Sequence, residues 1–377
     1  MRIAMVQGRA DPGRDGVTDY AAHLADALRA TGAAVEPVAT AGSPGDVVRA
    51  ARRIARWDPD VVHVQFAPSA FGFRPWPGLL PELVRAPVVT TVHEYGWWAA
   101  PSWVPAAVWR AVERPGWFDR ETGRLVPASA VTVTTNAGHT DQLRTRLGVR
   151  ARLVPLAPNV PDAGGGWHSV REDLGVPPDA EVVAFFGFVH PVKGLRYLID
   201  AVARLRAAGR DRLHLLVLGG FTSLALPEPQ ARAFRAELTT WAAARGVAEH
   251  VTVTGHLPAE RVSCALRTAD LAAFPFTAGA TTKSGALLSA FAHGLPTVVT
   301  AADPPDPDLV DGETVVVAPR VRDPDVLVDA LGRLLDDPVL RDRVAAGGTA
   351  LAARRSWPRI AAAHRELYAR VTERAGG

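Results

Sequence analysis

The chain has 377 residues, 48% of them hydrophobic and 21% charged, and a formal net charge of +3. This balance is typical of a packed, folded protein and excludes a disordered chain, and so small a net charge gives no indication of a nucleic-acid-binding face. The length exceeds the size at which one hydrophobic core stops growing, so we expect two domains.

The N-terminus is a short apolar run, residues 2–6, followed by Gly- and Asp-rich sequence. The run is too short for a signal peptide, and no window holds the roughly 18 apolar residues that a membrane span needs. We interpret it as a first β-strand. A single cysteine, Cys264, excludes an internal disulfide. These features favour a cytoplasmic protein.

Short apolar runs alternate with amphipathic segments along the whole chain, which is typical of β-α units around parallel sheets. Helices are predicted between the strands of the first half, for example at 19–30, which stops at Gly32. The predicted strands of the first half are 2–6, 61–66, 88–92, 131–135 and 152–156. Those of the second half are 181–186, 213–218, 250–254, 271–274, 297–300 and 314–317.

The segment 156–166 is dense in Pro and Gly, and a new strand pattern begins at residue 181. We therefore place a domain boundary there, with one Rossmann-like α/β domain at 1–165 and a second at 166–355. Open α/β sheets bind ligands at the carboxyl ends of their strands, so two such domains facing each other would form one cleft.

Lysine occurs at two positions among the 42 lysine and arginine residues, Lys193 and Lys283. Both lie in glycine-flanked loops before predicted helices, at 187–194 and 279–285. Helix N-termini present N–H groups and partial positive charge, and a compact ammonium beside them suits a phosphate better than the bulkier guanidinium. We interpret the lysines and the N–H groups of 282–285 as a phosphate site near solvent. The alternative is that two lysines persisted by chance.

Several motifs in this order resemble a GT-B glycosyltransferase of the large retaining glycosyl transferases group 1 family. The stretches that carry the resemblance are 13–20, 60–66, 90–95, 187–194, 291–299, 311–313 and the start of a last helix at Ser356-Trp357. The resemblance implies a nucleotide-sugar donor bound by the second domain, an acceptor bound by the first, and a last helix, 356–377, that packs back on the first domain.

The donor motif departs from the family in three places. Phe188 stands where the family has an arginine, and the family's paired glutamates, counted back from Gly294, fall at Thr281 and Ser289. Hydroxyl groups still hydrogen-bond sugar or ribose, and Lys283 could replace the missing arginine charge. The residues that we predict to bind the donor are Gly16, Gly187, Lys193, Thr281, Thr282, Lys283, Ser284, Gly285 and Ser289.

His93 ends an apolar strand, and the resemblance places a histidine of this position near the transferred sugar. The alternative is a buried, hydrogen-bonded core histidine. The predicted catalytic residues are His93, Lys193 and Lys283. The predicted acceptor-binding residues are Asp15, Gly16, Glu94, Trp97 and Trp98, since tryptophan rings stack on sugar faces. A membrane-touching patch of tryptophans is less favoured, because few positive charges accompany it.

These features predict a glycosyltransferase that moves a sugar from a UDP- or GDP-sugar to a small-molecule or envelope-glycan acceptor, with retention implied by the resemblance. We expect no cofactor beyond this co-substrate and no metal site, and interpret the Pro-broken stretch 303–308 as a solvated turn. An Arg-rich, Lys-poor chain suggests a bacterial enzyme, for example in natural-product biosynthesis. The alternatives are a non-catalytic nucleotide-sugar-binding homologue and a sugar-nucleotide epimerase, which would need carboxylates that are replaced here.

Overall fold

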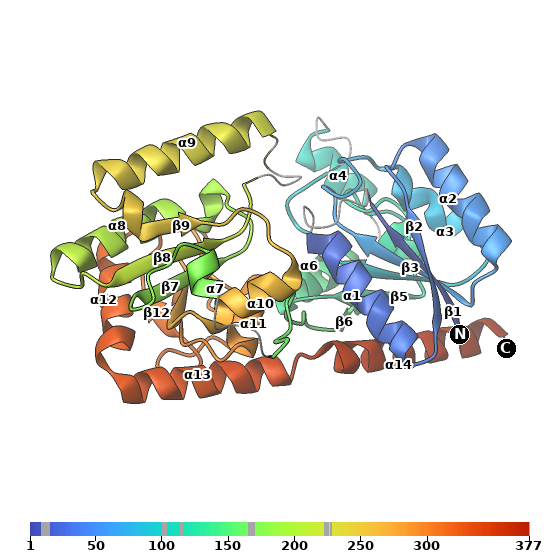
Figure 1. Ribbon diagram of the computed structural model, residues 1–377. Coiled ribbons are helices and arrows are strands. Elements are labelled where there is room, and N and C mark those ends of the chain that lie inside the picture. Colours follow the sequence, from blue (N-terminus) through green and yellow to red (C-terminus); the bar gives the residue numbers. More distant parts are fainter. Residues whose placement is uncertain are drawn as a thin grey trace. The chain divides into compact units, whose positions relative to one another are not determined.

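The computed structural model describes residues 1–8, 16–99, 104–113, 116–164, 170–221, 226 and 228–376. Contacts within the chain divide it into two compact units, Met1–Leu156 with Trp357–Gly377 as unit 1, and Ala157–Ser356 as unit 2. Each unit is built around a six-stranded sheet with helices (Figure 1). The predicted fold class, two Rossmann-like α/β domains, is confirmed.

The strands of unit 1 pair in parallel in the order β2-β1-β3-β4-β5-β6. Its elements are β1 (Arg2–Gln7), α1 (Gly16–Ala30), β2 (Ala34–Ala39), α2 (Pro44–Trp57), β3 (Val61–Phe66), η1 (Trp76–Leu79), α3 (Leu80–Leu83), β4 (Val88–Val92), α4 (Ala106–Val112), α5 (Leu125–Ala128), β5 (Val131–Thr134), α6 (Ala137–Leu147), β6 (Arg152–Leu153) and α14 (Trp357–Gly376).

The central strands β3 and β4 are buried at every position, as expected for strands covered on both faces. The sequence did not predict β2, which contains Pro37. Proline lacks the N–H that a ladder needs, but β2 lies at the edge of the sheet, where a proline is tolerated. Strand β6 ends at Leu153 rather than at the predicted residue 156.

Helix α14 returns to unit 1 and packs along α1. In Figure 1 it is the red helix beside the blue α1. Its inner face is buried, and Ile360, His364 and Tyr368 have exposed fractions of 3% or less, so they belong to the core of unit 1.

The strands of unit 2 pair in parallel in the order β12-β11-β10-β7-β8-β9. Its elements are α7 (Val170–Asp173), β7 (Glu181–Phe186), η2 (Pro191–Lys193), α8 (Leu195–Ala207), β8 (Leu213–Leu218), α9 (Glu228–Ala244), η3 (Ala248–His250), β9 (Val251–Val253), α10 (Ala259–Arg267), β10 (Leu271–Phe274), α11 (Gly285–Ala292), β11 (Thr297–Thr300), β12 (Val316–Ala318), α12 (Pro324–Asp336) and α13 (Pro338–Ala353).

The division between the units falls at Leu156, earlier than the predicted boundary at residue 165. The segment after Leu156 bonds to unit 2. The Asn159 amide donates to the Gly285 carbonyl at 3.2 Å, and the Ala163 amide donates to the Ser263 hydroxyl at 3.0 Å. The Pro- and Gly-rich stretch resembles a linker in the sequence, but these bonds make it part of unit 2.

Buried histidine makes the stability of unit 1 dependent on pH. Burial lowers the pKa of His364 from 6.5 to about 4, and its Nδ1 donates to the Ile360 carbonyl at 2.8 Å. Because the folded pKa is the lower one, this stabilisation is complete above pH 6.5 and is lost as the pH falls toward 4. From this group we expect the free energy of urea unfolding to fall by about 2 kcal/mol between pH 7.5 and 5.0.

The variant His364→Leu should show a shallower pH dependence than the wild type by that amount. The exposed His256 offers a control, and His256→Gln should keep the wild-type dependence. An unchanged slope in His364→Leu would show that this histidine does not titrate with unfolding.

Candidate functional site

The two lysine loops leave neighbouring strands of unit 2. Strand β7 leads to β8 on one side of the sheet, and β10 lies on its other side, so the strand order reverses between β7 and β10. Ligands of open α/β sheets bind at such a reversal, outside the carboxyl ends of the strands. The loop with Lys193 follows β7 and the loop with Lys283 follows β10.

The two loops touch each other. The Thr277 amide donates to the Val192 carbonyl at 2.9 Å. A Cβ at Gly187 would lie 3.5 Å from the Ala286 Cβ, in the first turn of α11, and a Cβ at Gly194 would lie 1.9 Å from the Pro275 carbonyl oxygen. Gly194 also has a φ of +72°, so only glycine fits there. The structure thus brings Gly187 and the Lys193 loop to the start of α11.

Lys193 is half-buried, and its Nζ lies 4.0 Å from the centroid of the Phe276 ring. Burial lowers the pKa of this ammonium to about 8. Lys193 was expected near solvent, and the structure places its ammonium over the Phe276 ring with its side chain half-buried. Burial leaves the ammonium weakly hydrated, and an anion would then bind it more strongly than in open water.

Lys283 is exposed, and the residues around it form the cap of α11. The Ser284 hydroxyl accepts from the Leu287 amide at 3.2 Å. The Thr282 amide and hydroxyl donate to Asp306 Oδ2 at 2.7 and 2.8 Å. A donor contact from the Thr282 N–H stays a prediction, and a phosphate there would compete with the Asp306 carboxylate.

The stretch 303–308 is more than the solvated turn that we expected. Asp306 holds Thr282, and Asp308 forms an ion pair with Arg355. This loop after β11 thus fixes the loop that carries Lys283. Among the residues described, no three His, Cys, Asp or Glu side chains gather as a metal site.

The two positions of the altered glutamates differ in the structure. Thr281 is half-buried at the loop, whereas Ser289 is fully buried. The Ser289 hydroxyl donates to the Gly285 carbonyl at 2.7 Å and accepts from the Val160 amide at 3.0 Å. A ribose contact from Ser289 stays a prediction, and it would compete with both bonds.

Asn159 was missed by the sequence analysis. A Cβ at Gly285 would lie 1.9 Å from Asn159 Oδ1, so this side chain packs against the first residue of α11. Asn159 lies inside a proline-rich stretch of the sequence, and nothing in the sequence indicates that it packs against Gly285. A close approach of this side chain, rather than a left-handed φ, therefore favours glycine at position 285.

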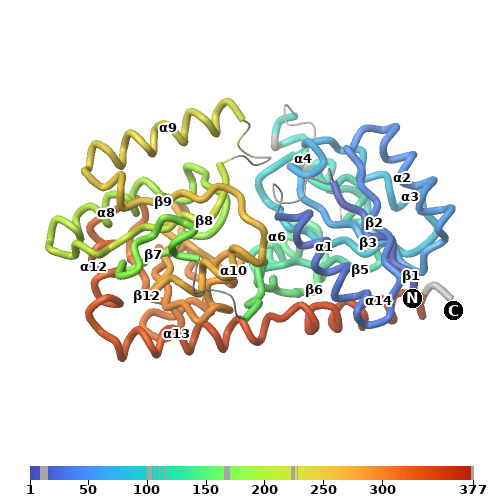
Figure 2. The backbone as a smooth tube through the Cα atoms, viewed as in Figure 1, coloured from blue at the N-terminus to red at the C-terminus, as the bar shows by residue number. Residues whose placement is uncertain are grey.

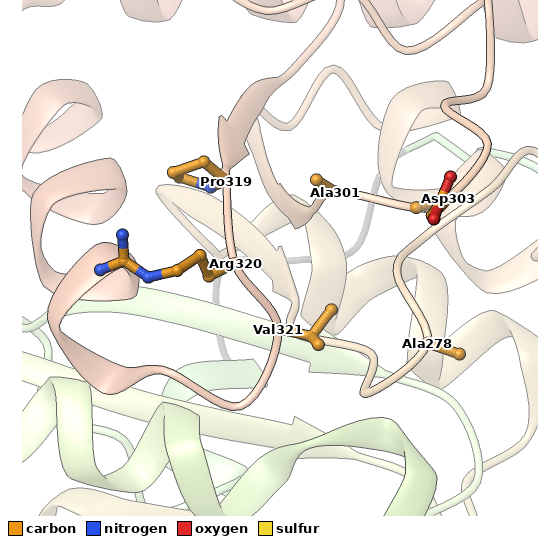
Figure 3. Close-up of a pocket in the computed structure, with 7 residues that line it drawn as sticks. Ala278, Ala301, Asp303, Pro319, Arg320 and Val321 are labelled. Atoms are coloured by element: carbon orange, nitrogen blue, oxygen red, sulfur yellow. The ribbon is translucent and has the colours of Figure 1, made fainter.

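A hollow of about 470 Å³ lies beside this loop, at the carboxyl ends of β10, β11 and β12. Figure 3 shows Arg320 and Asp303 on its opposite sides, with Ala301 and Val321 between them. Arg320 also pairs with Asp323 at 2.8 Å. The sequence analysis did not find this hollow, because its walls come from three loops distant in the chain.

In unit 1, His93 follows β4 and is half-buried. Its Nε2 lies 2.9 Å from Oε1 of Gln65 on β3, and its ring packs edge-on against Tyr20 with centroids 4.8 Å apart. The structure places His93 at the carboxyl end of the sheet as predicted, and it adds Gln65, which the sequence analysis read as an ordinary strand residue.

The predicted acceptor residues after His93 lie on one irregular segment. The Ser69 hydroxyl donates to the Glu94 carboxylate at 3.3 Å, and Phe73 packs against both Trp97 and Trp98 with centroids 5.9 Å away. Trp97 is 60% exposed. Gly16 begins α1, and a Cβ there would meet nothing within 4 Å, whereas Asp15 lies outside the described residues.

A buried ion cluster anchors this segment. Arg146 pairs with Asp119 at 2.8 Å and also with Glu113 and Glu121. The Gly96 amide donates to Glu121 at 2.9 Å. Burial raises the pKa of Asp119 to about 6. The cluster was not predicted, because its charges come from separate loops and from α6.

Comparison with known proteins places these features in a family. The family model of the glycosyl transferases group 1 matches residues 180–337. A D-inositol 3-phosphate glycosyltransferase of Xylanimonas cellulosilytica is 31% identical over 84% of this chain and 73% of its own length. A phosphatidyl-myo-inositol mannosyltransferase of Mycobacterium leprae is 27% identical over 98% and 97%, and an alpha-D-kanosaminyltransferase of Streptomyces kanamyceticus is 27% identical over 74% and 69%.

Solved structures share the fold over nearly the whole chain. Sucrose-phosphate synthase from Thermosynechococcus elongatus has a TM-score of 0.73 at 19% identity, covering 98% of both chains. Anabaena HepE in complex with UDP-glucose has a TM-score of 0.72 at 15% identity, covering 98% of this chain and 99% of its own. No described helix has both the length and the apolar character needed to cross a membrane.

The buried position of Ser289 gives a test of its role. We expect Ser289→Ala to lower the free energy of unfolding by about 1–3 kcal/mol, because the buried Val160 amide loses its acceptor. Thr281→Ala is the matched control, since it removes a hydroxyl from the same motif, and it should cost less than about 0.5 kcal/mol. Urea unfolding measures both. Unchanged stability of Ser289→Ala together with a raised donor KM would instead support the ribose contact.

Proposed function

Because this chain belongs to the glycosyl transferases group 1 family, we propose that it transfers a sugar from a nucleoside-diphosphate sugar to a hydroxyl or amine of a small acceptor. The observation that carries the proposal is the position of its two lysines. Lys193 and Lys283 lie on touching loops after β7 and β10, where the strand order of unit 2 reverses and α11 begins.

The chemistry requires stabilisation of a leaving anion. Cleavage of the sugar–diphosphate bond leaves negative charge on the departing phosphate, and preorganised cations that meet this charge lower the barrier. We assign Lys193 and Lys283 to this role. Two ammonium groups supply the charge that a divalent cation supplies in other sites, so we propose a metal-independent transfer. Retention of configuration is proposed from the family resemblance alone.

The altered donor motif bears on which donor is bound. Ser289 turns its hydroxyl to Val160 and Gly285, so an ionised carboxylate is replaced by a group that already has partners. We infer that the half-buried Thr281 makes the sugar contact, next to the exposed Lys283 that we assign to the phosphate. A UDP- or GDP-sugar fits this proposal, and a thermal-shift screen of UDP-, GDP- and dTDP-sugars would choose between them.

We assign the acceptor side to unit 1. His93 at the end of β4, Glu94, Gly16 and the rings of Trp97 and Trp98 would meet the acceptor and the transferred sugar. The name of one relative, a D-inositol 3-phosphate glycosyltransferase, supports a small hydroxylated acceptor. The name of another, a phosphatidyl-myo-inositol mannosyltransferase, is consistent with an acceptor of the cell envelope. A role in bacterial natural-product biosynthesis is consistent with a small acceptor.

A second candidate is a homologue that binds the nucleotide sugar without turnover. The inward Ser289 is the observation that favours it, because a donor-binding carboxylate was exchanged for a structural bond. Slow hydrolysis of the donor without acceptor separates the two, since an enzyme would release free sugar over hours and a binder would not.

The lysines give a first prediction for the activity. We expect Lys193→Gln and Lys283→Gln each to lower kcat/KM by about tenfold to a thousandfold, the range for loss of one group that stabilises a developing anion. Initial rates at subsaturating donor measure this. Arg320→Gln, at the neighbouring hollow, is the control and should stay within about twofold. Wild-type rates in both lysine variants would remove the proposed phosphate site.

The lowered pKa of Lys193 gives a second prediction for the activity. Only the ammonium form attracts phosphate, and in the free enzyme it loses its proton as the pH rises through about 8. We therefore expect the donor KM to rise about tenfold per pH unit above that value. Lys193→Arg keeps its charge over this range, so its KM should be flat between pH 7 and 9 even if its value is higher. A flat wild-type profile would contradict the assignment of Lys193.

A further inference from the structure

A chain of buried polar side chains runs through unit 1 to His93. His63 and Gln65 are two residues apart on β3, so they share one face of the sheet, and each has an exposed fraction of 0%. Polar side chains buried at this depth are costly unless they are hydrogen-bonded. Their partners therefore indicate what keeps them there.

Tyr368 on α14 is the last side chain of this hydrogen-bonded series, at the end away from His93. Its hydroxyl lies 2.6 Å from Nδ1 of His63, although the two residues are 305 positions apart in sequence. Figure 2 shows the red tube of α14 beside the blue α1, in the unit that contains β3. The helix thus brings a phenol from the end of the chain into the core of the first sheet.

Both ring nitrogens of His63 are engaged. Nδ1 faces Tyr368, and Nε2 lies 2.8 Å from Oγ1 of Thr91 on β4. Burial, followed by the neighbouring His364 and His93, lowers the pKa of His63 well below its ordinary value, so the ring is neutral. One nitrogen then donates and the other accepts, and each finds a hydroxyl, which can do either.

Gln65 connects His63 to His93. Its Nε2 lies 3.1 Å from Nε2 of His63 and 3.2 Å from the Met5 sulfur, and its Oε1 lies 2.9 Å from Nε2 of His93. A thioether sulfur only accepts, so the amide nitrogen belongs on the Met5 side and the carbonyl oxygen on the His93 side. The amide orientation is therefore fixed by Met5 and His63 rather than by His93. The amide N–H can donate to Nε2 of His63 when His63 carries its proton on Nδ1, where the Tyr368 hydroxyl accepts it.

A carbonyl oxygen accepts and cannot donate, so Nε2 of His93 must carry the hydrogen of this bond. We propose that Tyr368, His63 and Gln65 are positioning residues that hold the His93 ring in place with a proton on Nε2.

This inference rests on the proposed function for its effect on catalysis, but not for its geometry. If His93 acts on a hydroxyl, a ring free to exchange its proton or rotate would spend part of its time in an unproductive form. Loss of such positioning lowers kcat by about tenfold to a hundredfold while donor binding, which we assign to unit 2, is kept.

The test begins with a pair of matched tyrosine variants. Tyr368→Phe removes one hydroxyl that bonds to His63. Tyr20→Phe is the control, because the Tyr20 hydroxyl is equally buried but has no hydrogen-bond partner among the described residues, and phenylalanine keeps its ring. We expect kcat to fall about tenfold in Tyr368→Phe with donor KM unchanged, and to stay within about twofold in Tyr20→Phe. Equal kcat in both variants would overturn the proposal.

A second measurement needs no turnover. Nitrogen-15 NMR of the histidine rings distinguishes a proton on Nε2 from one on Nδ1, and His93→Gln assigns the signal. We expect the Nε2-protonated form in the wild type and a mixture in Gln65→Leu. A wild-type ring protonated on Nδ1 would overturn the positioning role. The expected tautomer in a protein that transfers no sugar would support the positioning role and count against the proposed function alone.

Discussion

The N-terminal half of α11 makes the contacts that position the surrounding loops of unit 2. Ser284 caps the helix, Gly285 admits the side chain of Asn159, and Ser289 binds the Val160 amide. The first turn of this helix lies against Gly187 at the start of the Lys193 loop. One short helix end therefore fixes the segment that leaves unit 1 and the loops that carry both lysines, so a change there would affect stability and donor binding together.

Much of the fold could be predicted from the sequence, because strands buried on both faces appear as continuous apolar runs. The strands β3, β4, β7, β8, β10 and β11 have the predicted bounds. Strand β2 was not predicted, because its Pro37 is acceptable only in an edge strand and the sequence does not show which strands lie at an edge. At the site, the lysine loops were found by their composition. The partners of Thr282 and Ser289 were not, because hydroxyls have no periodicity and their partners lie on other loops.

The hydrogen-bonded polar side chains of unit 1 also could not be predicted from the sequence. His63 and Gln65 lie in a run that predicts a strand correctly, and the run gives no sign that both side chains are buried with partners. Tyr368 is 305 residues away from His63, and only the return of α14 to unit 1 brings it close. A histidine at a strand end can be recognised from sequence, whereas the groups that decide its tautomer depend on the folded core.

The cost of burial gives a physical reason for a lysine rather than an arginine at position 193. Arginine keeps its charge at every ordinary pH, so a half-buried guanidinium must be paired or pay the full desolvation penalty. Lysine can release its proton instead, and burial lowers the pKa of Lys193 to about 8. An empty site then tolerates this side chain above Phe276, and a bound phosphate would restore its charge. Lysine thus suits a half-buried site that must be stable both with and without an anion, and an arginine there would be more costly without one.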